Sequence, residues 1–294
     1  MKSKYKMFKI HFDRLFNIDI GAILRLICEI SIRLTVFLNN QDKMIKRLRE
    51  IVSDVSKQYF LPMIIDDYWD LKMRALHAFQ CLMMLSVIKT LNKKRLTVVD
   101  IGDSSGTHMR YLKGLAGNEY EINTISVNLD ARAIEKIKAQ GQEAILCRAE
   151  DIDLKDRTID LYTSFEMLEH LHNPAIFLYS LAKRGKCDVL LLTIPYLRRS
   201  RVGLHYIRNG DLYKNRFAED VHVFELSPED WTLLFRHSGW IVQYSEIYLQ
   251  YPKGIPILSS ILAAFWRKID YEGFWGVILK RDTSVSDCYL DWEQ

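Results

Sequence analysis

The sequence predicts an α/β protein built on a doubly wound parallel sheet, and two observations support this prediction. From about residue 97 to residue 194, short runs of β-branched and aliphatic residues alternate with segments of helical periodicity. The run 187–194 is apolar almost throughout, as expected of a central strand covered on both faces. Such alternation produces strand–helix–strand units, whose parallel strands form one sheet between two layers of helices.

The composition is that of a globular chain with one large core. Its 294 residues are 49% hydrophobic, enough for one α/β core and an appendage, and a net charge of +4 gives no sign of a nucleic-acid partner. The five cysteines are scattered, without a C-x-x-C pair or a histidine at ligand spacing, which argues for a reducing compartment and against structural zinc. The first residues carry lysines and then mixed charges rather than the apolar core of a signal peptide, so we expect a cytoplasmic protein.

Residues 1–60 are expected to form a helical, basic and apolar extension ahead of a domain at 61–294. Arg25, Glu29 and Arg33 fall four residues apart and make one narrow polar stripe on a helix that carries too many charges to span a membrane. The rest of this helix is a wide apolar surface, made of Ile23, Leu24, Leu26, Ile27, Ile30, Leu34 and Phe37. Two predictions remain open for it: packing on the main domain or on a second subunit as a homodimer, or contact with the inner face of a membrane, where the N-terminal lysines would meet anionic lipid.

The domain is predicted to begin with a helix over 68–91, whose apolar residues recur at helical spacing and whose end is basic. A long, weakly periodic insertion at about 195–222, with six basic and three acidic residues, is expected to serve function, because long insertions beside strand ends usually do. After the first strand and its helix, further strands are expected at 122–127, 144–147, 158–164, 187–194, 240–248 and 274–280. Further helices are expected at 130–140, after Asn173-Pro174, and from Ser227 to His237.

The stretch from Thr97 to Leu112 predicts a strand, a tight loop and a helix, and we expect the loop to bind a ligand. Glycines allow the backbone to come close to a bound molecule, and the amides at the start of the following helix face the same crevice. An ordinary turn between a strand and a helix can have the same sequence, so the loop alone does not distinguish a ligand-binding loop from such a turn. The spacing from Gly102 to Gly106 lacks the G-x-G-x-x-G pattern of dinucleotide-binding loops.

Several motifs, in order along the chain, carry a family resemblance. They are Asp100 to Gly106, Ala149-Glu150-Asp151-Ile152, the segment from Ile159 to Leu171, which is the most specific, Leu191 to Pro195, and His222 to Gly239. With them, the chain from about Leu96 to Arg281 resembles a class I S-adenosylmethionine-dependent methyltransferase of the type 11/23 kind. The resemblance implies a Rossmann-like sheet of seven strands with the last strand antiparallel, and S-adenosyl-L-methionine as the cofactor.

The resemblance also implies which residues hold the cofactor. The loop after the first strand would wrap its methionine part, Asp151 would meet the adenine amine, and the end of the second strand would bind the ribose. There the family's acid aligns with Asn128, a weaker partner for a hydroxyl than a carboxylate, and Asp130 is the alternative. Ser104 replaces the family's middle glycine, which a serine can do if its φ is not positive, and Asp103 adds a charge. The full set is Asp100, Gly102, Asp103, Ser104, Gly106, Asn128, Asp130, Glu150, Asp151, Ser164, Phe165 and Glu166.

Methyl transfer from a sulfonium is an in-line displacement, so the positioning of acceptor and methyl supplies most of the effect and no covalent nucleophile is needed. If the acceptor is a hydroxyl, a base is useful, and His170, His205 and His222 are the candidates because each lies in a segment expected near the crevice. For each of them a structural role is the competing interpretation. No metal is expected, because His170 and His172, two residues apart at a helix start, would not point together and no third ligand is evident.

The predicted function is methyl transfer (EC 2.1.1.-) from S-adenosylmethionine to a small molecule or glycan precursor, at oxygen. The basic insertion favours an anionic acceptor, such as a phosphorylated or nucleotide-linked sugar or a lipid-linked glycan, because arginine binds phosphate in a bidentate way. A solvated charged surface is the alternative explanation of the same arginines. Two other functions stay open: transfer to nitrogen or carbon, which needs no histidine base, and a non-catalytic scaffold that kept the fold while its cofactor loop drifted.

Overall fold

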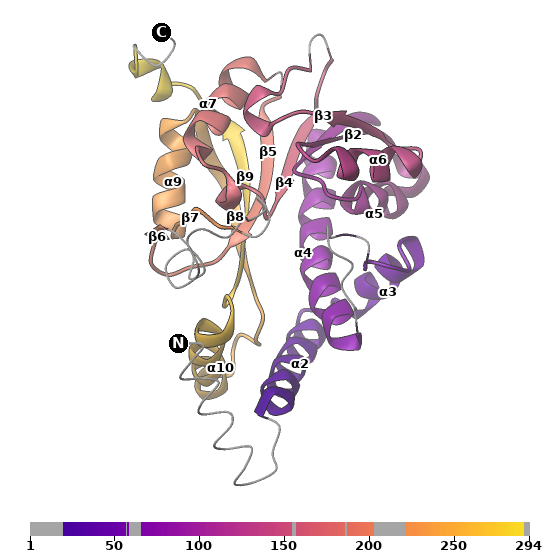
Figure 1. The fold of residues 1–294 in the computed structure, drawn as a ribbon, viewed down its shortest axis with the longest axis vertical. Helices are drawn as coiled ribbons and strands as arrows, with labels where there is room; N and C mark the ends of the chain where they lie inside the picture. Colours follow the sequence, from indigo (N-terminus) through magenta and orange to yellow (C-terminus); the bar gives the residue numbers. More distant parts are fainter. Residues whose placement is uncertain are drawn as a thin grey trace.

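The computed structural model of the chain describes residues 20–56, 58, 66–154, 157–185, 187–202 and 221–290, and has a seven-stranded sheet at its centre (Figure 1). The strands lie in the order β3-β2-β1-β4-β5-β9-β8. Neighbouring strands are parallel except at β9, which runs antiparallel to both β5 and β8. Their bounds are β1 Arg95–Ile101, β2 Glu121–Asn128, β3 Glu143–Leu146, β4 Leu161–Phe165, β5 Val189–Pro195, β8 Trp240–Leu249 and β9 Gly273–Arg281. This topology confirms the predicted Rossmann-like sheet with its last strand antiparallel.

The central strands are buried on both faces, which explains why their sequences are apolar without alternation. Side chains point to opposite faces at successive positions of a strand. Val98 and Leu191 therefore join one hydrophobic core, whereas Val99, Leu190 and Leu192 join the core on the other face. All five side chains are completely buried. The prediction of a central strand over 187–194 is confirmed for the residues of β5.

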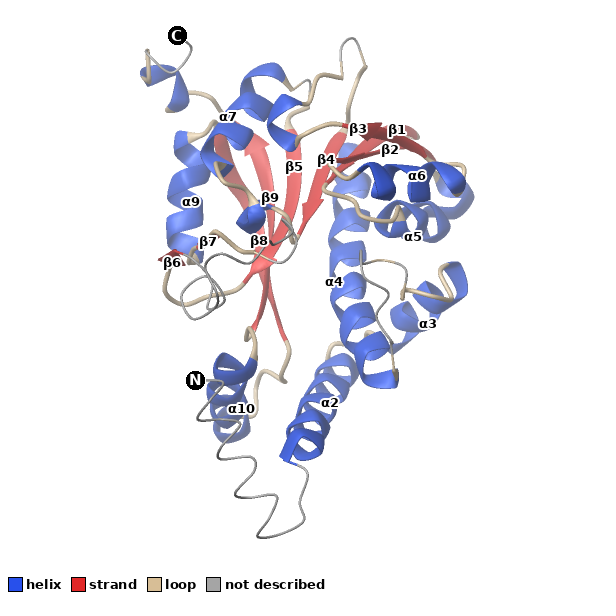
Figure 2. Cartoon of the chain, in the orientation of Figure 1, coloured by secondary structure: helices blue, strands red, loops and turns tan. Residues whose placement is uncertain are grey.

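Two helical layers cover these faces (Figure 2). The core on the first face contains residues of α4 and α5, and the core on the second contains residues of α7 and α9. A third, small cluster joins α6 to β3 through Ile134, Ile137 and Ala144. The helix bounds are α4 Asp67–Leu91, α5 Thr107–Ala116, α6 Ala131–Ala139, α7 Pro174–Arg184 and α9 Pro228–His237.

The fourth strand begins later than its sequence suggests. The apolar run predicted a strand over 158–164, but β4 starts at Leu161. Just before it, the Asp160 carboxylate accepts a hydrogen bond from the Thr97 amide (2.8 Å), while the Asp160 amide donates to the Thr97 carbonyl (2.9 Å). A side-chain acceptor thus replaces a main-chain carbonyl at this point, and the regular ladder starts one residue on.

Helix α4 is the core helix of the first face. Among the described residues it alone has the length and hydropathy of a membrane-spanning helix, but 72% of that window is buried inside the protein. It is capped at its start by Asp66, whose side chain accepts from the Trp69 amide, and at its end by Asn92 in a left-handed conformation. A helix covered in this way by its own domain is typical of a folded core, and its apolar sequence needs no membrane.

Part of the N-terminal extension packs on the main domain. The extension contains α2 (Ile20–Leu38) and α3 (Asp42–Ile51) within the described residues. One face of α2 buries Cys28, Ile32 and Val36 in the same core as α4. Ser31 adds a polar contact, because its hydroxyl donates to the Gln250 carbonyl (2.7 Å) and accepts from the Trp266 indole (3.1 Å).

The opposite face of α2 stays exposed, at the end of the molecule where α10 (Pro256–Ile269) also lies (Figure 1). Helix α10 connects β8 to β9 and buries Leu262, Ala263 and Trp266. Large apolar side chains of both helices remain in solvent: Ile23, Leu26, Ile30, Leu34, Phe37 and Leu38 on α2, and Ile257, Ile261 and Ile269 on α10. Of the seven residues of the apolar surface predicted for the extension, five are exposed and Leu24 and Ile27 are half-buried, so this chain leaves most of that surface uncovered.

The predicted insertion at about 195–222 is described only at its two ends. There β6 (Arg201–Val202) pairs antiparallel with β7 (Phe224–Glu225) in a separate two-stranded sheet. His205, one of the three candidate bases, lies outside the described residues. His170 and His222 are described, and their positions are given below.

Candidate active site

The loop between β1 and α5 adopts a conformation that favours glycine at two positions. Gly102 has φ +94°, and a Cβ atom there would lie 2.6 Å from Cγ of Met167. Gly106 has φ +71°, caps α5, and a Cβ atom there would lie 2.2 Å from Nε2 of Gln142. The backbone conformation therefore disfavours a side chain at both positions, and at Gly102 the Met167 side chain also occupies the space, whereas the Gln142 amide near Gly106 can move.

Asp103, the added charge in this loop, is turned back into the loop itself. Its Oδ1 accepts hydrogen bonds from the amides of Ser105 (3.0 Å) and Gly106 (2.7 Å), and its Oδ2 accepts from the Ser126 hydroxyl (2.6 Å). Burial raises the pKa of Asp103, and these three hydrogen bonds oppose that rise. These hydrogen bonds hold the Asp103 side chain within the loop and stabilise the loop conformation.

Ser104, which replaces the family's middle glycine, is accommodated without backbone strain. It is not among the described non-glycine residues with positive φ, and its hydroxyl donates to the Gln58 carbonyl (2.8 Å). The two departures of this loop from the family pattern thus leave its glycine geometry in place.

Asp100 lies deeper, below the loop, and ties β1 to β4. It is 2% exposed and accepts a hydrogen bond from the Thr163 hydroxyl (2.9 Å). Burial raises the pKa of Asp100 well above its usual value, and the nearby Asp103 carboxylate adds to this rise. Two buried acids three residues apart, one in β1 and one in the loop that follows, are unusual in a purely structural core.

The two candidates for the ribose at the end of β2 are both engaged with neighbours. Asn128 donates from Nδ2 to the Asp103 carbonyl (3.0 Å) and accepts at Oδ1 from the Asp130 amide (2.8 Å). Asp130 caps α6 by accepting from the Arg132 amide (3.0 Å) and also pairs with the Arg132 guanidinium. Asn128 is therefore the one that contacts the glycine loop, and Asp130 serves α6.

The acidic pair predicted for the adenine lies just after β3. Glu150 and Asp151 belong to the short 3-10 helix η2 (Ala149–Asp151), and Asp151 is exposed. Glu150 pairs with Arg148 at 3.5 Å. Because β3 and β2 are neighbours in the sheet, this pair lies at the same edge of the sheet as Asn128.

The end of β4 contains buried polar atoms without partners in the described chain. The Ser164 hydroxyl and Oε1 of Glu166 accept or donate no hydrogen bond among these residues. Glu166 also has φ +50°, which is strained for a residue with a side chain, and burial raises its pKa to about 8. Phe165 between them contacts the His108 ring, at 4.6 Å between centroids. Strain and unsatisfied polar atoms at one strand end are typical of a binding site.

Two of the three predicted histidines come together beside this strand end. The rings of His170, on η3 (Leu168–His170), and His222, just before β7, meet edge to face with centroids 4.5 Å apart. Nδ1 of His170 lies 3.0 Å from the Val221 carbonyl. Nδ1 of His222 lies 3.2 Å from the Glu225 carboxylate and 3.0 Å from the Tyr271 hydroxyl.

Sequence reasoning missed three residues of this cluster: Glu169, Glu225 and Tyr271. Glu169 is 1% exposed, and burial raises its pKa well above the usual value, with a further rise from the Glu166 carboxylate. Glu169 lies within the motif from Ile159 to Leu171, so its spacing from Glu166 in the sequence could have indicated it. Tyr271 lies in the turn before β9, far from the others in sequence, and no local pattern could have indicated it.

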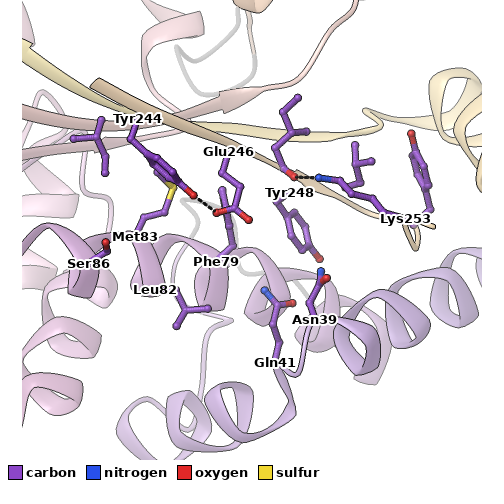
Figure 3. Close-up of a pocket in the computed structure, with 14 residues that line it drawn as sticks. Asn39, Gln41, Phe79, Leu82, Met83, Ser86, Tyr244, Glu246, Tyr248 and Lys253 are labelled. Carbon is purple, nitrogen blue, oxygen red and sulfur yellow. Dashed lines mark hydrogen bonds between the residues drawn. The ribbon is translucent and has the colours of Figure 1, made fainter. Parts of the chain in front are cut away.

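A cavity of about 330 Å³ lies elsewhere, between α4 and β8. Figure 3 shows Phe79 and Leu82 of α4 facing Tyr244 and Glu246 of β8 across it, with the Tyr244 hydroxyl donating to Glu246 (3.0 Å). None of the predicted cofactor residues or histidines lines this cavity. The candidate site is therefore the strand ends around the glycine loop.

Comparisons with known proteins agree with this geometry. The profile of a family described as a methyltransferase domain matches residues 99–188. No curated protein matches the sequence. A structure assigned as a sarcosine dimethylglycine methyltransferase from Galdieria sulphuraria is 12% identical, with a TM-score of 0.50, covering 82% of this chain and 98% of that one.

A second similar structure is the 1,6-didemethyltoxoflavin-N1-methyltransferase of Burkholderia thailandensis, solved with its substrate and S-adenosylhomocysteine. It is 12% identical, with a TM-score of 0.50, and the match covers 83% of this chain and 90% of that one. At this identity the likeness establishes the fold. Residues 99–188 thus match a methyltransferase domain, and the chain has the fold of class I S-adenosylmethionine-dependent methyltransferases.

Proposed function

We propose that this protein transfers a methyl group from S-adenosylmethionine to an oxygen atom of a small molecule or glycan precursor. The observation that carries the proposal is the loop after β1: Gly102 and Gly106 hold it in a conformation that favours glycine, and the Asp103 side chain is hydrogen-bonded within the loop. Asp103 and Ser104, the two departures from the family's loop, are both held by hydrogen bonds that leave this conformation in place. The residues present therefore fit the cofactor.

The cofactor, when bound, supplies an activated methyl group on a positively charged sulfur. The backbone of the loop from Gly102 to Gly106 would hold its methionine part, Asn128 its ribose and Asp151 its adenine. The Ser164 hydroxyl and Oε1 of Glu166, which lack partners among the described residues, are available to hydrogen-bond at the same strand end. The protein's contribution is mainly orientation, because in-line displacement gains most from a fixed near-attack arrangement.

The histidine cluster favours an oxygen acceptor over nitrogen or carbon. A hydroxyl must lose its proton as it is methylated, and an imidazole held by a carboxylate is suited to assist. His222 has this arrangement through Glu225, and His170 lies against it. An amine acceptor would need no such pair.

Fewer arginines are available to bind an anionic acceptor than the sequence suggests. Arg198 pairs with the buried Glu272 (3.0 Å), and Arg201 pairs with the buried Glu225. These guanidinium groups are engaged in holding the ends of the insertion. Recognition of a phosphate would therefore depend on Arg199 and on the basic residues between 203 and 220, which lie outside the described residues.

Calorimetry with S-adenosylmethionine and S-adenosylhomocysteine tests the proposal on the full chain. We expect both to bind, and a failure of both near physiological concentration would instead favour the scaffold. Transfer is then followed with a 13C-labelled methyl group, whose NMR shift in the product separates O-methyl from N-methyl and C-methyl products. An N-methyl product would overturn the oxygen assignment while keeping the enzyme.

We further propose that the α2–α10 end of the molecule contacts an anionic membrane at its cytoplasmic face. Phe37 and Ile257 are 69% and 79% exposed on two neighbouring helices. In sequence, α2 is preceded by Lys2, Lys4, Lys6, Lys9 and Arg14 against the single acid Asp13 between residues 2 and 14. Exposed apolar side chains together with adjacent basic residues are the combination that binds anionic bilayer surfaces.

Flotation with vesicles tests this contact. We expect the full chain to float with vesicles containing phosphatidylglycerol and to stay in solution with phosphatidylcholine alone. Deleting residues 1–60 is an unsuitable test, because α2 supplies part of the core, so substitutions of exposed residues are used instead. Sedimentation equilibrium showing a dimer that is lost with the same substitutions, without flotation, would replace the membrane by a second copy.

A further inference from the structure

Three potential metal ligands meet at the end of β4. Glu169, His170 and His222 each offer one ligand atom, and these atoms all lie within 4.8 Å of one another. Two imidazoles and one carboxylate form a ligand set typical of zinc and other divalent transition metals. His172, whose place two residues from His170 spoke against a metal in the sequence, is exposed, and the third ligand group comes from His222, 52 residues beyond His170.

Glu169 is the residue that points to a ligand. Its side chain is 1% exposed, and within the described residues neither carboxylate oxygen has a hydrogen-bond partner. An uncompensated buried carboxylate is costly, and proteins normally pair such a group or use it to coordinate a metal. Oε1 of Glu169 faces Nε2 of His170 at 4.0 Å, so the carboxylate points into the cluster.

Both histidines are oriented as metal ligands usually are. A carbonyl oxygen can only accept, so Nδ1 of His170, 3.0 Å from the Val221 carbonyl, carries the proton and Nε2 has the lone pair. For His222, Nδ1 lies against the Glu225 carboxylate and the Tyr271 hydroxyl, and Tyr271 in turn donates to Glu225 (2.5 Å). Such outer contacts fix the tautomer of ligating histidines.

We propose that Glu169, His170 and His222 form a binding site for one divalent transition-metal ion. The two imidazole side chains are 16% and 17% exposed, which leaves an entry path from the histidine side. Three protein ligands leave at least one coordination position open. If the proposed function holds, that position suits the acceptor oxygen: a bound ion would favour loss of its proton, and the two histidines would assist as ligands of the ion in place of the base considered above.

Metal binding is measured on the tag-free, full-length chain after chelation, by Zn²⁺ calorimetry and by the visible absorption of Co²⁺. We expect one ion per chain. Glu169→Gln and His222→Gln should each weaken binding by at least about 100-fold, since loss of an outer partner alone costs about 10-fold to 100-fold. Tyr271→Phe, which removes only an outer contact of His222, should weaken binding by about 10-fold.

His172→Gln is the matched control, because it removes an exposed histidine two residues from His170. It should bind the ion as the unchanged chain does. Equal affinity in the unchanged chain, Glu169→Gln and His222→Gln would overturn the site, as would no binding at all. S-adenosylhomocysteine binding, measured on the same samples, separates this result from the proposed function: an ion bound without S-adenosylhomocysteine keeps the site and rejects the enzyme, and the reverse rejects only the site.

Discussion

The carboxyl edge of the sheet and the α2–α10 end of the molecule depart from ordinary packing in opposite ways. At the sheet edge, charged groups such as Asp100, Asp103 and Glu169 are buried. At the other end, large apolar side chains such as Phe37 and Ile257 face solvent. Each departure costs free energy in a folded monomer, by desolvating charge in one place and by exposing apolar surface in the other.

This difference indicates which kind of ligand each region would bind. A buried charge is relieved by directional partners, as Asp103 is relieved by two amides and a hydroxyl, and this makes the sheet edge rigid and specific. An exposed apolar surface is relieved by any apolar environment, so the helical end suits a bilayer, which has no defined shape. Substitutions in one region should therefore leave the property of the other unchanged.

Replacing Gly102 by alanine should have the largest effect. The new Cβ would meet Met167 at 2.6 Å on a backbone with φ +94°, so overpacking and strain together should cost about 3 kcal/mol and lower affinity for S-adenosylhomocysteine by on the order of 100-fold. Gly117→Ala is the control, because φ is also positive (+56°) but nothing lies within 4 Å. Equal losses of affinity in the two variants would show that the loop does not bind the cofactor.

Asp103→Ala should destabilise the sheet edge by at least about 2 kcal/mol, because the Ser105 and Gly106 amides lose their buried acceptor. Asp130→Ala, which removes the cap of α6, should cost about 1 kcal/mol. Urea unfolding of both variants measures the difference. If the two values are equal, the buried carboxylate is no more important than a surface cap.

Leu26→Glu should lower the binding of the chain to phosphatidylglycerol vesicles by about tenfold, since it replaces an exposed apolar contact by a charge of the wrong sign. Leu233→Glu on α9 is the matched control, because its leucine is similarly exposed (59% against 56%) but lies away from the α2–α10 end. Flotation of both variants provides the readout. Equal flotation of the two variants would show that the α2–α10 end does not contact the membrane.

The smallest effect concerns pH and the core between the two regions. Burial lowers the pKa of His108 to about 3, and its ring is hydrogen-bonded to Gln80 (2.8 Å). Below pH 6.5 the unfolded chain binds a proton at His108 that the native chain does not bind. The free energy of unfolding therefore falls as the pH falls from 6.5 toward 3, by up to about 1.4 kcal/mol per pH unit. Burial also lowers the pKa of the neighbouring His77.

His108→Gln should remove one such proton and flatten this slope by about 1 kcal/mol between pH 6.5 and 5.5. Unfolding by urea at the two pH values measures the change. An unchanged slope would mean that His108 is protonated in the folded protein and that its burial has no such consequence.

Much of the sheet could be predicted because its signals are local. The apolar run that became β5, the glycines at 102 and 106, and the caps at Asn173 and Ser227 each reflect backbone and burial requirements of a few neighbouring residues. The start of β4 was wrong by three residues, because the Asp160 carboxylate replaces a main-chain partner of β1. That contact joins segments more than 60 residues apart.

The candidate site was predicted less completely. The cofactor loop was located from its glycines, but whether Asp103 obstructs it depends on Ser126, which reaches it from the neighbouring strand. Asn128 and Asp130 had equal standing in the sequence, and the structure divides them, since one contacts the loop and the other caps a helix. These distinctions depend on side-chain direction, which a linear pattern does not contain.

The sequence by itself determined the order of strands and helices, the glycine loop and the apolar character of α2, because periodicity and backbone conformation are properties of consecutive residues. Tertiary structure alone decided that His222 and Tyr271 join His170, and that half of α2 is covered while the other half is not. The physical reason is chain folding: a contact between distant segments depends on how the whole core packs, and no short stretch of residues encodes it.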